Sequence, residues 1–239
     1  MKAKAKVKLI RPGNTKLGEV ACFSILAGNT CPGKTETCAE NCYAMKQFFK
    51  MENVRKAHRR NWAASEEPDF EDRMIDEIRQ EDIELLRVHV AGDFYNAGYI
   101  RKWIRIAESC PESEFFAYTH SWHIEELQDP LKRLAELPNL QLWWSCDKDT
   151  HVEHGEPHRL DGVKVAYLQS EPGEPIPEYT DLVFRVKRKT VEKYVDGRLV
   201  CPAEQGIKPK PSCEKCRLCF SGKDIPKKLH SPSIPLFSP

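Results

Sequence analysis

Short apolar runs alternate with longer amphipathic segments along most of this chain. Six runs have the length and composition of buried strands, at residues 20–26, 85–91, 115–119, 140–145, 163–168 and 182–186. Apolar residues recur at helical spacing over 43–64, 68–80, 99–107 and 124–137, where Pro130 is expected to kink or divide the last helix. Strands joined by such crossovers pair in parallel. The pattern therefore predicts an α/β fold with a parallel sheet of six strands.

Polar residues follow five of these strands at the point where each strand ends. The segments are Gly92-Asp93-Phe94, His120-Ser121, Cys146-Asp147, Gln169-Ser170 and Lys187-Arg188. The carboxyl ends of parallel strands form one rim, where the ligand-binding groups of α/β folds collect. Any single Asp, Ser or Gly is explained by the turn that must follow a strand. Five such ends in succession favour a binding site along the rim.

Composition excludes several classes of protein. The 239 residues include 37 Lys and Arg against 36 Asp and Glu, a balance that requires neither nucleic acid nor an acidic partner. The basic first residues lack the apolar core of a signal peptide, and no apolar run approaches the roughly 20 residues of a bilayer span. We therefore expect a cytoplasmic protein that does not bind a membrane. Ten cysteines, seven of them in two clusters, favour metal binding over disulfides.

The first cluster lies in a loop rich in Gly, Pro and Thr, directly after the first strand. Its cysteines are Cys31, Cys38 and Cys42. Three thiolates leave one position of a metal or of an iron–sulfur cluster free, which distinguishes a catalytic centre from a structural one. Cys22 in the first strand, or a histidine, could close the site instead and make it a structural zinc loop.

The second cluster contains Cys201 and the closely spaced Cys213, Cys216 and Cys219. Four thiolates at this spacing complete a cage, which suits a structural Zn²⁺ or a [4Fe–4S] cluster. The Cys-x-x-Cys-x-x-Cys run is similar to that of ferredoxins and favours iron–sulfur. Elsewhere, Cys110 is expected in the core, whereas Cys146 lies at the rim.

A basic run in the first predicted helix comprises Arg55, Lys56, His58, Arg59 and Arg60. Such a run is most often a solvated helix face. The alternative is a contact with phosphate or nucleic acid.

These motifs resemble those of two known families. The cysteine loop that ends in Cys42-Tyr43-Ala44 is similar to the loop of radical S-adenosylmethionine enzymes, particularly the spore-photoproduct-lyase-like ones, although its cysteine spacing is longer. Gly92-Asp93-Phe94 falls where that superfamily carries a Gly-Gly-Glu motif. The segments Cys-Pro-Gly-Lys-Thr, Cys-Tyr-Ala and Ala-Gly-Asp-Phe-Tyr also resemble, over roughly residues 20–220, a phage protein family known as gene product eighty-eight.

The resemblance implies an open parallel (β/α)6-type barrel over residues 1–190 and a cysteine-rich extension and tail over 191–239. It implies that the first cluster holds a [4Fe–4S] centre that binds S-adenosylmethionine, and that the second holds an auxiliary cluster or zinc. The implied catalytic residues are Asp93, His120 and Asp147, and the implied cofactor-binding residues are Gly92, Asp93, Ser121 and Gln169. The expected substrate is a small molecule, a nucleotide or nucleic acid. A donor protein would supply electrons, in the host cytoplasm if a phage encodes the chain.

Two other interpretations fit the same residues. The chain could resemble the tRNA-guanine transglycosylases, zinc-containing barrels that exchange bases, with Asp93 or Asp147 as the nucleophile and the C-terminal cysteines as the zinc site. It could instead be a non-catalytic module that binds nucleic acid and is held together by zinc at both clusters. Iron or zinc in the purified protein would separate the first interpretation from the other two.

Overall fold

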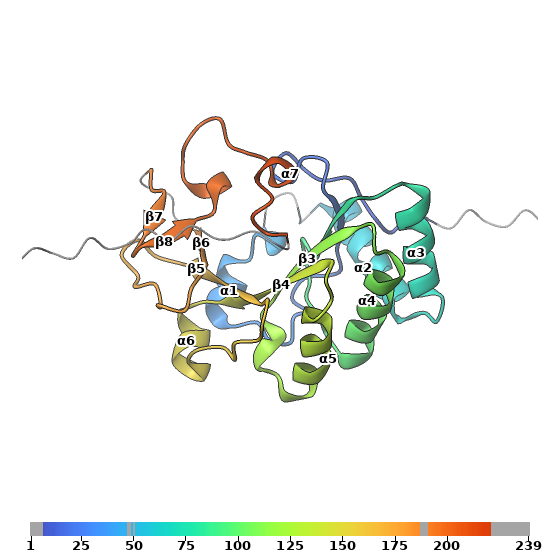
Figure 1. The fold of residues 1–239 in the computed structure, drawn as a ribbon, viewed down its shortest axis with the longest axis horizontal. Helices are drawn as coiled ribbons and strands as arrows, with labels where there is room; N and C mark the ends of the chain where they lie inside the picture. Colours follow the sequence, from blue (N-terminus) through green and yellow to red (C-terminus); the bar gives the residue numbers. More distant parts are fainter. Residues whose placement is uncertain (1–6, 47–48, 50, 187–190, 221–239) are drawn as a thin grey trace, which may run out of the picture.

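The computed structural model describes residues 7–46, 49, 51–186 and 191–220. In this part of the chain, eight strands form one sheet in the order β1-β2-β3-β4-β5-β6-β8-β7 (Figure 1). The strands are β1 (Ala21–Phe23), β2 (Leu85–Val88), β3 (Glu114–Thr119), β4 (Leu140–Cys146), β5 (Lys164–Gln169), β6 (Leu182–Arg185), β7 (Tyr194–Val195) and β8 (Arg198–Val200). Every neighbouring pair is parallel except β7 and β8. The fold is therefore mixed α/β with a mostly parallel sheet.

Four longer helices pack on one face of this sheet (Figure 1). They are α2 (Glu52–Glu66), α3 (Phe70–Gln80), α4 (Ala97–Ser109) and α5 (Glu125–Ala135). In α4, the Asn96 side chain caps the helix by accepting a hydrogen bond from Tyr99 N at 2.8 Å, and the following turns bury Trp103 and Ile104. Burial of a large apolar side chain contributes roughly 1.5–3 kcal/mol. Packing of these helix faces therefore holds the outer side of the sheet.

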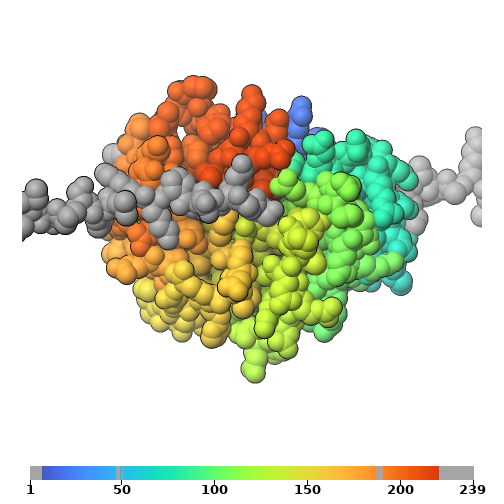
Figure 2. All heavy atoms as spheres, in the orientation of Figure 1, coloured from blue at the N-terminus to red at the C-terminus, as the bar shows by residue number. Residues whose placement is uncertain are grey.

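The opposite face, which we call the inner face, is covered by both ends of the described chain. Leu17 and Val20 pack on it from the N-terminal segment, and Leu218 and Phe220 pack on it from the C-terminal segment. The C-terminal segment is red in Figure 2 and lies directly on the body of the molecule. The strand residues on this face include Cys22, Leu85, Arg87, Phe116, Tyr118, Trp143, Ala166, Leu182, Phe184, Tyr194 and Leu199. Side chains alternate along each strand, so this face is separate from the one that the helices cover.

Short helices occupy several of the connections. They are α1 (Glu36–Asn41), η1 (Tyr43–Met45), η3 (Ser121–His123), α6 (Lys148–His154), η4 (Pro202–Glu204) and α7 (Cys213–Cys216). The first four follow the carboxyl ends of β1, β3 and β4, so they border the predicted rim. No helix in the described ranges combines the length and the apolar character that crossing a bilayer requires.

All six predicted strands are confirmed as β1 to β6. The helix predicted over 43–64 is confirmed in its later part as α2, but its start is wrong, because the chain forms η1 first and α2 begins at Glu52. The helix predicted over 124–137 is confirmed as α5, which continues through Pro130, so of the two effects expected of that proline the division does not occur. Helices α1 and α6 were not predicted from the sequence, because each is too short to show helical periodicity.

The hairpin of β7 and β8 extends the sheet beyond the six predicted strands. β8 pairs with β6, so the sheet continues past residue 190, where the sequence favours a domain division. Asp196 and Gly197 form the turn with φ angles of 47° and 74°. Two positive φ angles are typical of the type I′ turn that Asp-Gly favours. Lys187 and Arg188, the polar pair predicted after the sixth strand, lie outside the described residues.

Candidate active site

A cavity of about 870 Å³ lies at the carboxyl ends of β2 to β6, between the rim and the cysteine loop. This volume is in the upper part of the range of about 300–1,000 Å³ that is typical of small-ligand sites. The predicted site residues that line it are Cys31, Cys38, Cys42, Gly92, Asp93 and His120. Five cationic residues also line it: Lys16, Lys34, Lys46, Arg87 and Arg185. The structure therefore brings the first cysteine cluster and part of the rim together.

Two aspartates that follow β4 hold the cysteine loop in place. Thr35 caps α1 by accepting a hydrogen bond from Cys38 N at 2.9 Å, and its hydroxyl donates to Asp147 Oδ2 at 2.5 Å. Asp149 Oδ2 accepts from Thr37 N at 2.7 Å. The position of Cys38 therefore depends on side chains more than 100 residues away in the sequence.

Gly33 brings the same loop into backbone contact with the end of β3. A Cβ at this position would lie 2.4 Å from the carbonyl oxygen of His120. His123 Nε2 lies 3.2 Å from the Gly33 carbonyl oxygen, a hydrogen-bonding distance. A side chain at Gly33 would therefore push the cysteine loop away from the rim.

The three thiols of the loop influence one another electrostatically. Burial, together with the negative charges of Asp93 and Cys42, raises the pKa of Cys31 to about 12. Burial, together with the charge of Cys42, also raises the pKa of Cys38 to about 12. Both thiols are therefore protonated at neutral pH in the absence of a bound cation. A coordinating metal ion would reverse this, because it deprotonates its thiol ligands.

The donor chemistry of the loop fits an iron–sulfur cluster, although the thiols do not form a ready-made cage. In the described part of the chain, no group of three or more His, Cys, Asp or Glu side chains is arranged so that it could hold a metal ion. Each thiolate of a cubane cluster binds a different iron, so the sulfurs stand farther apart than the ligands of one ion. Three free thiols on one cavity match the number and type of donors that such a cluster with one open iron needs.

Asp93 is buried at the end of β2, and burial raises its pKa to about 6. Its Oδ1 accepts a hydrogen bond from Phe94 N at 2.7 Å. Its Oδ2 accepts from His120 N at 2.9 Å and from Ser121 Oγ at 3.2 Å. These bonds tie the end of β2 to the end of β3. Asp93 thus positions the cavity wall, and its predicted contact with a cofactor stays a prediction.

Gly92 and His120 line the cavity together with Asp93. Gly92 has a φ of 90°, and a Cβ there would lie 2.3 Å from Cγ1 of Ile25, so glycine allows the ends of β1 and β2 to approach. Burial lowers the pKa of His120, which keeps its ring neutral at neutral pH. Its buried Nδ1 has no hydrogen-bond partner among the described residues. This nitrogen is available to a ligand.

Asp147, Ser121 and Gln169 lie behind the cavity wall and are not among its described lining residues. Asp147 is fully buried and caps α6, accepting from Asp149 N at 3.1 Å. Ser121 donates to Asp93, and Gln169 Nε2 donates to the Glu174 carbonyl oxygen at 3.0 Å. Each side chain supports a turn of the rim. Their predicted roles in catalysis or cofactor binding stay predictions.

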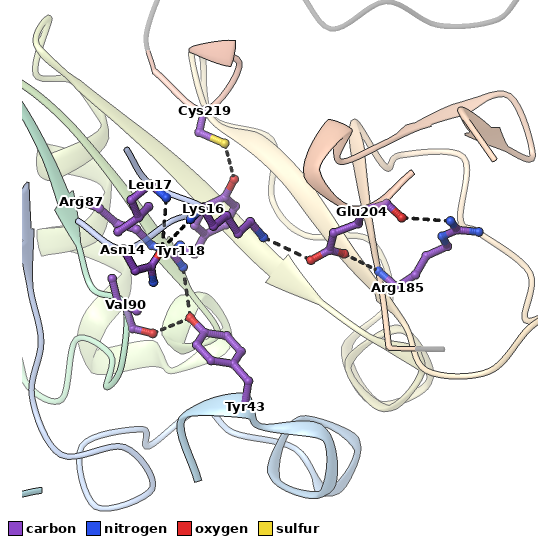
Figure 3. A network of polar contacts seen from close by, with 10 residues as sticks. All are labelled: Asn14, Lys16, Leu17, Tyr43, Arg87, Val90, Tyr118, Arg185, Glu204 and Cys219. Atoms are coloured by element: carbon purple, nitrogen blue, oxygen red, sulfur yellow. Dashed lines mark hydrogen bonds and ion pairs between the residues drawn. The ribbon is translucent and has the colours of Figure 1, made fainter. Parts of the chain in front are cut away.

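The second cysteine cluster lies against the inner face and outside the described cavity lining. Tyr118 Oη donates to Cys219 Sγ at 2.9 Å (Figure 3). Burial raises the pKa of Cys201 to about 12 and that of Cys219 to about 11. Cys219 is also influenced by the charges of Cys213 and Cys216. Cys201, Cys213 and Cys216 therefore each lie within electrostatic range of Cys219, although the described thiols are not arranged as the ligands of one metal ion.

Arg87 connects the cavity with the second cluster, and sequence reasoning missed it. Its Nε donates to the His89 carbonyl oxygen at 3.0 Å, and its Nη2 donates to Tyr43 Oη at 3.3 Å (Figure 3). Its Cζ lies 5.7 Å from the ring centroids of both Phe116 and Tyr118, a cation–π distance. The available signal was a charged residue inside the apolar run at 85–91.

The basic run of α2 lies outside the described cavity lining. Arg55, Lys56 and Arg59 are exposed, and Arg59 pairs with Glu52 at 3.3 Å. These residues form a solvated helix face, the more ordinary of the two predicted roles. Contact with nucleic acid stays a prediction.

A sequence model of the family described as "Gene product 88" matches residues 2–222 of this chain. The chain belongs to the gene product 88 family. The "Gene 88 protein" of Mycobacterium phage L5 is 24% identical over 234 residues, which cover 91% of this chain and 90% of that protein. The "Gene 88 protein" of Mycobacterium phage D29 is 26% identical over 240 residues, with the same coverage of both chains. No solved structure matches.

The match to the gene product 88 family extends across both cysteine clusters and the whole described cavity. The predicted resemblance to this phage family is therefore confirmed. The resemblance to radical S-adenosylmethionine enzymes stays a prediction.

Proposed function

We propose that this member of the gene product 88 family is an iron–sulfur enzyme of the radical S-adenosylmethionine type. One observation carries the proposal: Cys31, Cys38 and Cys42, three thiols of one loop, line the same cavity as the ends of the parallel strands. When bound there, a [4Fe–4S] cluster with one open iron supplies one-electron chemistry on S-adenosylmethionine.

The proposed architecture is an open (β/α)6-type barrel. Its support is the consecutive parallel order of β1 to β6, with α2 to α5 packed on the outer side. The inner face corresponds to the barrel interior, and the rim corresponds to the end where barrel enzymes carry their active sites. The C-terminal cysteine segment lies on that interior face.

The chain's own residues position the ligands in this proposal. Asp147 and Gly33 hold the cysteine loop at the rim, and Asp93 joins the ends of two strands beside it. The neutral ring of His120 supplies an unpaired nitrogen in the cavity wall. The second cluster holds an auxiliary iron–sulfur centre or zinc.

The partners follow from the same proposal. An electron donor protein reduces the cluster, and a nucleotide or nucleic acid is the substrate. Because both curated relatives are phage proteins, the proposed location is the cytoplasm of the host.

A zinc-containing base-exchange enzyme is the second candidate, favoured by the buried carboxylate of Asp93 in the cavity wall. In that case the Asp93 carboxylate would form an ester bond to the base-bearing carbon as the bond from that carbon to the departing base breaks, and the four C-terminal thiols would hold zinc. Against it, both carboxylate oxygens of Asp93 already accept hydrogen bonds. The non-catalytic zinc module is favoured by no separate observation.

The test is metal and sulfide analysis of protein purified without oxygen. We expect iron and acid-labile sulfide, a broad visible absorption, and loss of one cluster in Cys38→Ala and of the other site in Cys216→Ala. Cys110→Ala is the matched control, because Cys110 is buried in the outer core, away from both clusters. Zinc without iron in the unsubstituted protein would reject the proposal and favour base exchange. Loss of both sites in either variant would reject two separate centres.

A further inference from the structure

The cavity contains five cations, three of which have no carboxylate partner among the described residues. Lys16 pairs with Glu204 at 3.1 Å. In contrast, Arg87, Lys34 and Lys46 have no carboxylate partner within the described ranges. The guanidinium of an arginine does not lose its proton in proteins, so Arg87 stays charged. A cation that is partly removed from water without a counter-ion is unfavourable, and a bound anion would relieve this cost.

Arg87 is held in a defined position by neutral hydrogen-bond and ring partners, and the charges of Cys213 and Cys219 act on it from the second cluster. It donates to the carbonyl oxygen of His89 and to the hydroxyl of Tyr43, and the rings of Phe116 and Tyr118 lie within cation–π distance. Figure 3 shows the hydrogen bond between Arg87 and Tyr43. A planar guanidinium held in this way is suited to bidentate hydrogen bonds with a phosphate or a carboxylate.

Aromatic side chains and an unpaired polar atom lie in the same cavity. Tyr43, Tyr118 and Phe184 line it together with Arg87. The ring of Tyr118 is already stacked on Trp143, whereas that of Tyr43 is exposed. An exposed ring can stack on a nucleobase without selecting one base, because every base has a π-face. His120 also lines the cavity, and its buried Nδ1 has no partner among the described residues. Buried polar atoms are rarely left without a hydrogen bond, so this nitrogen also indicates a ligand.

We infer that the cavity binds a nucleoside phosphate, with the phosphate on Arg87, Lys34 and Lys46 and the base against the aromatic side chains. The inference names the substrate class of the proposed enzyme and rests on the assignment of the cavity as its active site. The recognised group is an anion, which either the phosphate of a nucleotide or the carboxylate of S-adenosylmethionine could supply. The presence of three cations without a carboxylate partner in the described ranges, together with the aromatic rings, favours the nucleotide.

The test compares ligands that differ by one chemical group, using the full-length protein and isothermal titration calorimetry at fixed salt. The probes are the four deoxynucleoside monophosphates, the four deoxynucleosides and deoxyribose 5-phosphate. We expect the affinity of at least one monophosphate to exceed that of its nucleoside by about tenfold or more, and to exceed that of the sugar phosphate by a similar factor. Equal binding of nucleotide and nucleoside overturns the inference. Binding of a DNA oligonucleotide without binding of any mononucleotide also overturns it and moves the contact outside the cavity.

Substitutions locate the phosphate. Arg87→Gln should weaken nucleotide binding about tenfold or more while nucleoside binding changes little. The matched control is Arg101→Gln, since Arg101 is an exposed arginine of α4 outside the described cavity lining. Lys34 and Lys46 are exposed, so Lys34→Gln combined with Lys46→Gln should fold and should weaken binding several-fold, with a shallower salt dependence. Unchanged nucleotide affinity in this double variant overturns the inference even if Arg87→Gln does not fold.

Two further measurements separate this inference from the proposed function. If Arg87→Gln weakens binding of S-adenosylmethionine but not of nucleotides, the anion is the cofactor carboxylate and the inference fails. Cys38→Ala should lose iron and still bind the nucleotide. Arg87-dependent nucleotide binding by a protein that contains no iron would support the inference and reject the proposed function.

Discussion

The two cysteine clusters have the same donor chemistry but different surroundings. The first lines a cavity, and its loop is held at the rim by the side chain of Asp147 and the close approach of Gly33. The second is packed against the inner face, where Tyr118 donates to Cys219 Sγ and Trp143 Nε1 donates to the Cys219 carbonyl oxygen at 3.0 Å. One cluster therefore faces the space for a ligand, whereas the other is enclosed by aromatic side chains.

The second cluster also joins the two ends of the described chain. Cys213 N donates to the Lys16 carbonyl oxygen at 2.8 Å, and Glu214 N donates to the Leu17 carbonyl oxygen at 3.2 Å. Loss of this cluster would release the covering of the inner face. Loss of the first cluster would release only a loop. We therefore expect the first to determine function and the second to determine stability.

The largest predicted effect concerns Asp93, beside the first cluster. Its pKa rises from the ordinary 3.8 to about 6 on folding, because burial disfavours the carboxylate. The folded state thus binds the proton more tightly than the unfolded state. The resulting stabilisation is present below about pH 4 and is lost as the pH rises to about 6, a change of up to about 3 kcal/mol.

Urea denaturation between pH 4 and pH 7 measures this change. Asp93→Asn should remove the decrease in the free energy of unfolding between pH 4 and pH 6, whereas Asp129→Asn, at an exposed position of α5, should retain it. Parallel profiles for the unsubstituted protein and Asp93→Asn would contradict the raised pKa.

The second prediction compares one cysteine from each cluster. Cys219→Ala leaves the Tyr118 hydroxyl without its sulfur acceptor, which should cost about 1–3 kcal/mol in the free energy of unfolding. Cys38→Ala removes a half-buried thiol from the cavity wall and should cost less. Combining Cys219→Ala with Tyr118→Phe should recover part of the loss, because neither partner is then left unpaired. Equal losses in the two cysteine variants would remove the proposed difference between the clusters.

Part of the fold and of the candidate site could be predicted from the sequence. The strands could be found because each is a run of buried apolar residues with a polar end, and β1 to β6 all form where such runs occur. The shared location of Cys31, Asp93 and His120 could be expected as well, since the carboxyl ends of parallel strands must meet at one rim.

Contacts between distant residues could not be predicted. Nothing near Thr35 in the sequence indicates that its hydroxyl bonds to Asp147, which makes that aspartate a support of the loop. The side on which Arg87 lies depends on the exact register of β2. The hairpin of β7 and β8 did have a signal, the Asp196-Gly197 pair, but its strands are too short to show alternation.

The third prediction addresses the attachment of the first cluster. Gly33→Ala places a Cβ 2.4 Å from the His120 carbonyl oxygen, a steric clash that should move the cysteine loop away from the rim. The rate of thiol modification at Cys38 should rise severalfold, measured by mass spectrometry after brief labelling. Gly98→Ala is the control, because that glycine of α4 has no positive φ and a Cβ there would meet only Asn96 Oδ1, at 3.3 Å. Equal labelling rates in the two variants would show that the contact does not hold the loop.

The smallest predicted effect is at Cys22, which decides whether the first cluster has three or four cysteine ligands. Cys22 lies on β1 and packs on the inner face with residues of the second cluster. Burial raises its pKa, and the charges of Arg87 and Arg11 offset part of this rise. No thiol of the cysteine loop contributes to the pKa shift of Cys22. Cys22→Ala should therefore leave the iron content of the first cluster unchanged and alter the free energy of unfolding by less than about 1 kcal/mol. Loss of that iron in Cys22→Ala would identify Cys22 as the fourth ligand. It would close the first cluster and make the two clusters alike.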